Sequence, residues 1–131
     1  MPAPTISEGR YASDWLKAES HNSGYSREEV IVISGAGVVQ SGTVLGKITA
    51  SGKYKPVTVG ASDGSQNAAG ILLNRVDATS ADVPAVIIAR DAIVVHQGLI
   101  YGADIDTSGE RAAVHTALRA LNPPILVREG A

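Results

Sequence analysis

Short apolar runs rich in β-branched residues recur along this chain, separated by turns that contain Gly or Ser. Val30–Ile33 is β-branched at every position, which favours a strand over a helix. Thr43–Thr49 and Tyr54–Val59 flank the turn Ala50–Lys53, and this arrangement predicts a hairpin. Further strands are expected at Ala69–Asn74, Ala85–Ala89, Ala92–Val95 and Ile125–Val127. Strands this short and closely spaced indicate a mainly β fold, a small β-clip or barrel-like domain.

One segment has the periodicity of a helix. Thr107 and Glu110 have the spacing of a capping box at a helix N-terminus. Val114, Leu118 and Leu121 follow at intervals that place them on one helical face. Two consecutive prolines then end the pattern, because proline cannot continue a helix. The sequence therefore predicts one clear helix near residues 108–121.

The first 25 residues differ from the rest of the chain. They are rich in Ser, Pro, Gly and charge, and their apolar side chains are isolated. We interpret residues 1–25 as an extended N-terminal arm and residues 26–131 as the β-rich domain. A short helix over Ser13–Ser20 is compatible with the sequence, because Ser13 is a suitable N-cap. On this interpretation, deleting Met1–Gly24 leaves the domain folded.

Composition narrows the classes to which the protein can belong. A chain of 131 residues fits one domain, and the absence of Phe means that its core must be aliphatic. The net charge of -2, with acids and bases interspersed, argues against direct binding to nucleic acid. Cysteine is absent, which excludes disulfides and thiolate metal sites. Met1–Thr5 lacks the features of a secretory signal, and no apolar run is long enough for us to expect a membrane span.

Gly60–Gly64 matches the G-x-S-x-G pattern of a serine hydrolase, with Ser62 as the nucleophile. That chemistry requires a strand before the serine, a helix after it, and a following acid and histidine. Here the pattern leads through a polar turn into another strand, so we expect no catalytic residue. A small serine hydrolase built on Ser62 remains the alternative from the enzyme class.

The remaining polar side chains also lack a clear ligand pattern. The histidines His21, His96 and His115 are scattered, without the spacing of metal ligands. Asp104, Asp106 and Glu110 form an acidic cluster. Asp104 and Asp106, followed by Ser108 and Gly109, resemble the start of a calcium loop, but its twelfth position is His115 instead of Glu. We expect these acids to stabilise the helix N-terminus. The sequence therefore predicts no cofactor and no metal site.

The order of segments in the domain resembles that of a known protein family. Asp63–Leu73 is a polar turn that runs into an apolar strand, preceded by Gly42–Lys47 and followed by Asp77–Val83 and Ala85–Arg90. This succession resembles the head decoration proteins of tailed bacteriophages, the lambda-type capsid-stabilising family. The resemblance covers roughly Ser26 to Arg128.

The resemblance implies a structural function and no enzymatic activity. Members of the family are compact β-rich proteins that bind as homotrimers at local three-fold sites of the expanded head. There they hold neighbouring major capsid protein subunits against the pressure of packaged DNA. The resemblance thus implies two partners, the major capsid protein and further copies of this chain. It also implies a place on the exterior of the virion capsid after synthesis in the host cytoplasm. A trimeric binding domain outside any virus is a further alternative.

Aromatic residues concentrate in the arm, although disordered segments are usually poor in them. The arm holds three of the five aromatic residues of the chain. Trp and Tyr are common anchors at interfaces, and in the resembled family the N-terminal segment makes much of the capsid contact. We therefore predict that the arm binds the capsid through Tyr11, Trp15, Leu16 and Tyr25. The alternative is that the arm folds back on its own domain.

Overall fold

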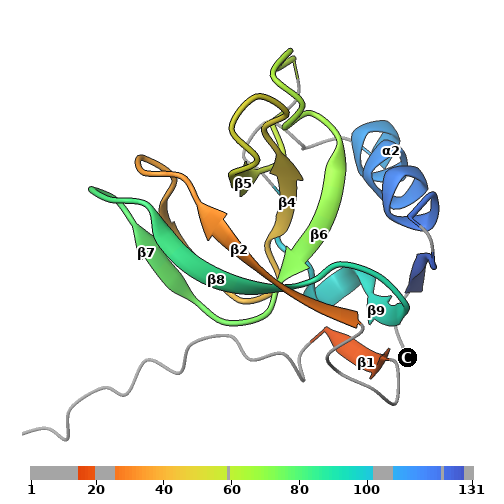
Figure 1. Ribbon diagram of the computed structural model, residues 1–131. Coiled ribbons are helices and arrows are strands. Elements are labelled where there is room, and N and C mark those ends of the chain that lie inside the picture. The colour runs from red at the N-terminus through yellow and green to blue at the C-terminus, as the bar shows by residue number, and fades with distance from the viewer. Residues whose placement is uncertain (1–14, 20–25, 59, 102–107, 122, 129–131) are drawn as a thin grey trace, which may run out of the picture.

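The computed structural model describes residues 15–19, 26–58, 60–101, 108–121 and 123–128 (Figure 1). Within these ranges the protein is mainly β, with one longer helix, as the sequence predicts. None of the helices there is both long and apolar enough to span a bilayer.

Five strands close into a small barrel. Their order around the barrel is β2, β5, β4, β6 and β8. All of the neighbouring pairs are antiparallel except β2 and β5, which pair in parallel at a single position, Val32 and Tyr54. The bounds are β2 (Arg27–Val32), β4 (Val44–Lys47), β5 (Tyr54–Pro56), β6 (Ala68–Leu72) and β8 (Val83–Ile88). These bounds confirm the strands predicted from the apolar runs, to within a few residues.

Two smaller sheets flank the barrel. In the first, β9 (Ala92–Val95) lies between β1 (Leu16–Glu19) and β10 (Ile125–Arg128). The strand β1 runs antiparallel to β9, whereas β10 runs parallel to it. The second sheet pairs β3 (Gly37–Val39) with β7 (Val76–Ala78).

The strand β1 corrects the interpretation of the N-terminal arm. A helix over residues 13–20 is compatible with the sequence, but Leu16–Glu19 is a strand that pairs with β9. An isolated helix as short as residues 13–20 is marginal in water. Pairing with β9 instead supplies hydrogen-bond partners for the backbone of Leu16–Glu19. The described part of the predicted arm therefore belongs to a sheet of the domain, and the boundary at residue 25 does not separate it.

The helix α2 (Ser108–Arg119) confirms the predicted helix, and it ends two residues earlier than expected. Its residues Val114 and Leu118 are buried, and Leu121 beyond its end is half-buried. Figure 1 shows α2 on the outside of the barrel, beside β6. The predicted cap residue, Thr107, lies outside the described residues. The 3-10 helix η2 (His96–Gly98) follows β9 directly.

The strands β6 and β8 form a wall between two cores. Their paired residues Ile71 and Ile88 face the core that also holds Val114 of α2, while the next pair, Leu72 and Ile87, faces the barrel interior. This alternation follows from the two-residue repeat of a strand. We call the first the helix-side core, and its buried members are Trp15, Val44, Val57, Ala68, Ile71, Leu73, Ile88, Ala92, Val94, Leu99, Val114, Leu118 and Ile125.

Candidate functional site

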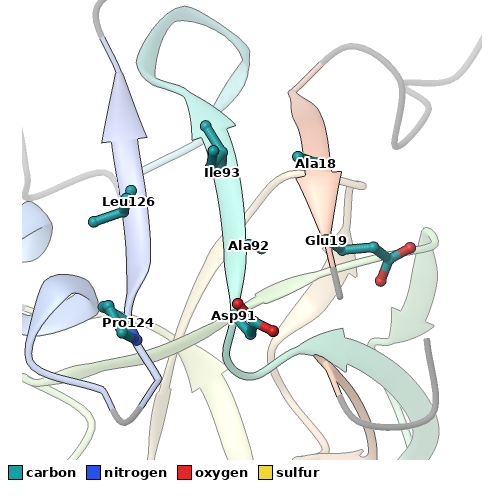
Figure 2. Close-up of a pocket in the computed structure, with 7 residues that line it drawn as sticks. All are labelled: Ala18, Glu19, Asp91, Ala92, Ile93, Pro124 and Leu126. Atoms are coloured by element: carbon teal, nitrogen blue, oxygen red, sulfur yellow. The ribbon is translucent and has the colours of Figure 1, made fainter. Parts of the chain in front are cut away.

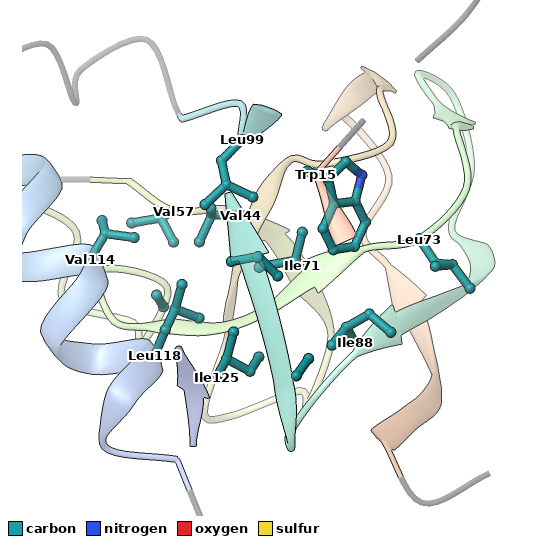
Figure 3. Close-up of a cluster of buried hydrophobic side chains, with 13 residues drawn as sticks. Trp15, Val44, Val57, Ile71, Leu73, Ile88, Leu99, Val114, Leu118 and Ile125 are labelled. Carbon is teal, nitrogen blue, oxygen red and sulfur yellow. The ribbon is translucent and has the colours of Figure 1, made fainter. Parts of the chain in front are cut away.

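Trp15 is the residue that ties the N-terminal segment to the domain. Its side chain is fully buried in the helix-side core, where Figure 3 shows it near Ile71, Leu73 and Leu99. The indole Nε1–H donates a hydrogen bond to the Ser41 hydroxyl at 3.0 Å. That hydroxyl in turn donates to the Leu73 carbonyl at 2.7 Å. Both polar groups are therefore satisfied inside an apolar core, which makes burial of the indole favourable.

The backbone around Trp15 leaves space for the indole ring. A Cβ atom at Gly42 would lie 2.9 Å from both Trp15 Cδ1 and the Gly98 carbonyl oxygen. Gly42 also has a φ of 93°, in the region that favours glycine. Only glycine fits this position without displacing the indole ring. Glycine at position 42 is therefore needed for Trp15 to be buried in the helix-side core.

This burial corrects the prediction for Trp15. A fully buried side chain cannot touch a capsid surface while the fold is intact, so Trp15 anchors the chain to its own domain. Leu16 is half-buried and packs against the same core. Tyr11 and Tyr25 lie outside the described residues. The expectation that residues 1–24 can be deleted without loss of the fold also needs correction, because that deletion would remove Trp15 and β1.

A polar cluster links the end of β1 to the start of β2. Glu19 Oε2 accepts hydrogen bonds from the Ser26 hydroxyl at 2.6 Å and from Arg27 Nε at 3.2 Å. Its Oε1 accepts from Arg27 Nη2 at 2.7 Å. The Arg27 hydrogen bond is the main cause that lowers the pKa of Glu19 below its ordinary value. The carboxylate therefore holds β1 and β2 together in its charged form.

The outer face of the three-stranded sheet carries a row of apolar side chains. Ala18, Ile93 and Leu126 are aligned across the three strands by the register of the sheet. Figure 2 shows them lining a pocket of about 210 Å³. Asp91 stands at one end of this pocket and adopts a φ of 53°, which is uncommon for a residue with a side chain. The pocket is completed by Glu19, Ala92 and Pro124.

The G-x-S-x-G match has a structural explanation. Ser62 is exposed in a turn, and the next element is the strand β6. The Asp63 carboxylate accepts hydrogen bonds from the Ser65 backbone N–H at 3.0 Å and from the Ser65 hydroxyl at 2.5 Å. A Cβ at Gly46 of β4 would overlap the Ser65 carbonyl. Ser62 therefore precedes a turn locked against β4 and then a strand, whereas a nucleophile elbow requires a helix at this point.

Comparison with models of known families gives a match over most of the chain. A family model described as bacteriophage lambda head decoration protein D matches residues 5–123 of this chain. The chain belongs to that head decoration family. The match begins upstream of Ser26, the residue at which the resemblance in the order of segments starts. It therefore includes Trp15 and β1. A search of curated proteins found no match.

Membership of the head decoration family identifies a structural protein of the phage virion, and it implies binding to the capsid. In a decoration protein the functional site is a docking surface, so burial and edge exposure are more informative than reactive side chains. Among the described residues, β1 is both the segment nearest the N-terminus and an edge strand of its sheet. The pocket over β1, β9 and β10 lies on this same sheet.

A second cluster is not predicted by the sequence. His96 Nδ1 lies 2.7 Å from the Tyr101 hydroxyl, and the same hydroxyl lies 2.7 Å from His115 Nε2. The two imidazole rings meet edge to face, with centroids 5.1 Å apart. No local pattern signals this meeting, because His96 and His115 belong to different elements. His21, Asp104 and Asp106 lie outside the described residues, and Glu110 lies in the first turn of α2.

Proposed function

We propose that this protein binds as a homotrimer to local three-fold sites on the exterior of the expanded phage head. There it would hold neighbouring major capsid protein subunits together against the pressure of packaged DNA, after synthesis in the host cytoplasm. The observation that carries this proposal is the family match over residues 5–123. No chemistry is required, because each bound copy stabilises the shell by its binding free energy and many sites add together.

We propose further that the capsid-facing surface comprises the outer face of the three-stranded sheet and the chain that leads into β1. The buried Trp15 supports this arrangement, because it holds β1 in place beside β9 and so fixes the position of the chain that leads into the sheet. Tyr11 and Tyr25, together with the half-buried Leu16, would make the direct contacts. The apolar row on β1, β9 and β10 would extend those contacts across the sheet.

Two matched substitutions test where the capsid binds. Ile93→Glu places a charge on the outer face of the sheet, whereas Ile31→Glu places the same charge on the outside of the barrel, where Ile31 is 40% exposed. In co-sedimentation with expanded shells, we expect Ile93→Glu to weaken binding at least tenfold and Ile31→Glu to bind normally. Melting curves of both variants identify any loss caused by unfolding. The opposite pattern would place the capsid contact on the barrel.

A truncation distinguishes the contribution of the N-terminal segment to folding from its contribution to capsid binding. Deleting residues 2–13 stops before Trp15 and leaves the core and β1 in place, so we expect a melting temperature close to that of the full chain. The same deletion removes Tyr11, and we expect weaker binding to shells. Full-length protein that does not bind expanded shells at all would refute the decoration function and favour a binding domain outside any virus.

The trimer is tested separately from the capsid contact. Sedimentation equilibrium over a wide concentration range measures the state in solution, and electron microscopy of decorated shells measures it on the head. We expect three-fold density at the local three-fold positions. A monomer in solution combined with single, unclustered copies on the shell would refute the trimer.

A further inference from the structure

His96, Tyr101 and His115 bring together three side chains of types that can bind a metal ion. His96 opens η2, Tyr101 follows shortly after it, and His115 lies in the middle of α2. Both imidazole rings present a nitrogen to the Tyr101 hydroxyl, each at 2.7 Å. All three side chains are half-buried, so solvent reaches the cluster.

The distances suit an ion that binds both imidazoles. Since each nitrogen lies 2.7 Å from the same oxygen, the two nitrogens are separated by at most twice that distance, 5.4 Å. Two imidazole ligands bound to one Zn²⁺ ion at about 2.0–2.1 Å are about 3.3–4.1 Å apart, from tetrahedral to linear geometry. A closure of about 2 Å or less therefore converts the hydrogen-bonded arrangement into a pair of ligands.

We propose that His96 Nδ1 and His115 Nε2, with the Tyr101 oxygen as a third ligand, bind a divalent first-row transition cation such as Zn²⁺ or Cu²⁺. The proposal is independent of the decoration function. Nitrogen ligands select such ions over Mg²⁺ and Ca²⁺, which prefer oxygen. Among the described residues no three His, Cys, Asp or Glu side chains form a metal cluster. The site is therefore a two-nitrogen, one-oxygen set, with water in the remaining positions.

Proton balance is met without any further reactant. The phenol carries one proton, so in the hydrogen-bonded cluster it donates to at most one of the two nitrogens that face it. The ring that instead presents an N–H moves that proton to its other nitrogen before it binds the ion. The Tyr101 proton passes to solvent as its oxygen becomes a ligand. Binding therefore weakens as the pH falls, because imidazole ligands must be deprotonated.

The surroundings provide access and set the strength of binding. A pocket of about 440 Å³ on α2 is lined by His115 and Arg119, so one side of the His115 side chain borders solvent. Arg111 and Arg119 lie one helical turn from His115 on either side, and their positive charge opposes a dication. We therefore expect the site to bind only an ion that forms strong bonds to nitrogen, as a transition-metal ion does.

The test uses the full-length protein without a histidine tag, freed of metal by a chelator and titrated calorimetrically with ZnCl₂. We expect one ion per chain, with affinity lowered at least tenfold in His96→Gln and in His115→Gln. His21→Gln is the matched control and should bind as the unsubstituted protein does. MgCl₂ should give no binding. With CuCl₂, a phenolate-to-copper charge-transfer band should appear and should be lost in Tyr101→Phe.

Two further measurements keep the proposal testable if a histidine variant folds poorly. In the unsubstituted protein, substoichiometric Cu²⁺ should broaden the ring resonances of His96 and His115 before those of His21. Zn²⁺ at 100 times its dissociation constant should raise the ratio of folded to unfolded protein about 100-fold. Absence of Zn²⁺ binding, equal binding in either cluster variant, or loss of binding in His21→Gln would overturn the proposal. The three side chains would then form a hydrogen-bonded bridge only.

Discussion

Replacement of Trp15 by Ala tests whether this residue stabilises the core of its own domain or anchors the protein to the capsid. The indole is fully buried, and its Nε1–H is bonded to the Ser41 hydroxyl. Truncation of a buried Trp or Phe to Ala costs about 3–5 kcal/mol. Loss of the hydrogen bond adds about 0.5–1.5 kcal/mol. Because a small domain is stable by only about 5–15 kcal/mol, we expect Trp15→Ala to remove a large part of the free energy of unfolding.

Chemical denaturation monitored by circular dichroism measures this effect without depending on tryptophan fluorescence. Trp15→Phe is the informative companion, since it keeps most of the buried ring and removes only the indole N–H. We expect it to cost about 1–2 kcal/mol, mostly from the lost hydrogen bond. The deletion of residues 2–13 serves as the control, because it shortens the same segment without touching the core.

The reasoning fails if Trp15→Ala lowers the free energy of unfolding by less than about 1 kcal/mol, since removal of a buried Trp costs more than that. If that stable variant also lost binding to expanded shells, Trp15 would be a surface anchor, as the sequence alone suggests. A large loss of stability together with normal shell binding by the folded fraction would support the buried position.

Three further outcomes are expected. Leu118→Ala should cost about 2–5 kcal/mol, since Leu118 is fully buried, and an unchanged melting temperature would show that α2 does not pack as described. The Arg27 hydrogen bond lowers the pKa of Glu19 below its usual 4.5, so the ion pair stabilises the fold above that pH and is lost as the pH falls through the lowered value. Melting temperature should therefore fall more steeply from about pH 5 to 3 in the native protein than in Glu19→Gln. Ser62→Ala should be silent in ester and peptide substrate panels, and activity that this substitution removes would revive the hydrolase alternative.

The elements predicted correctly are those whose local sequence and tertiary surroundings favour the same conformation. Val30–Ile33 is β-branched and lies mostly in β2, and the stripe that includes Leu118 packs in α2. The strand β1 is missed because Leu16–Glu19 contains no β-branched residue, and its conformation is imposed by pairing with β9. The short strands β3 and β7 are missed for a similar reason, since each has only three residues and depends on the other.

The candidate site is predictable in outline, and one of its residues is misassigned by the sequence. A tryptophan in a polar segment indicates correctly that the segment contacts something, but composition cannot tell a core of the same chain from a partner. The deciding features are Ser41, which satisfies the indole N–H, and Gly42, which leaves space for the ring. Both lie far from Trp15 in the sequence. The cluster of His96, Tyr101 and His115 is invisible for the same reason, since spacing rules detect ligands only within one element.

The three-stranded sheet also determines where the two ends of the described chain lie. Leu16, at the start of β1, pairs with Val94, and Arg128, at the end of β10, pairs with Val95. Both ends therefore lie at the same end of β9, two strand spacings or about 10 Å apart. A linker of about five residues would span that gap, because three extended residues already cover about 10 Å. A circular permutant that links Arg128 to Trp15, so that the buried indole is kept, and that is reopened in the exposed turn at residues 50–52 would keep every strand beside its present neighbours.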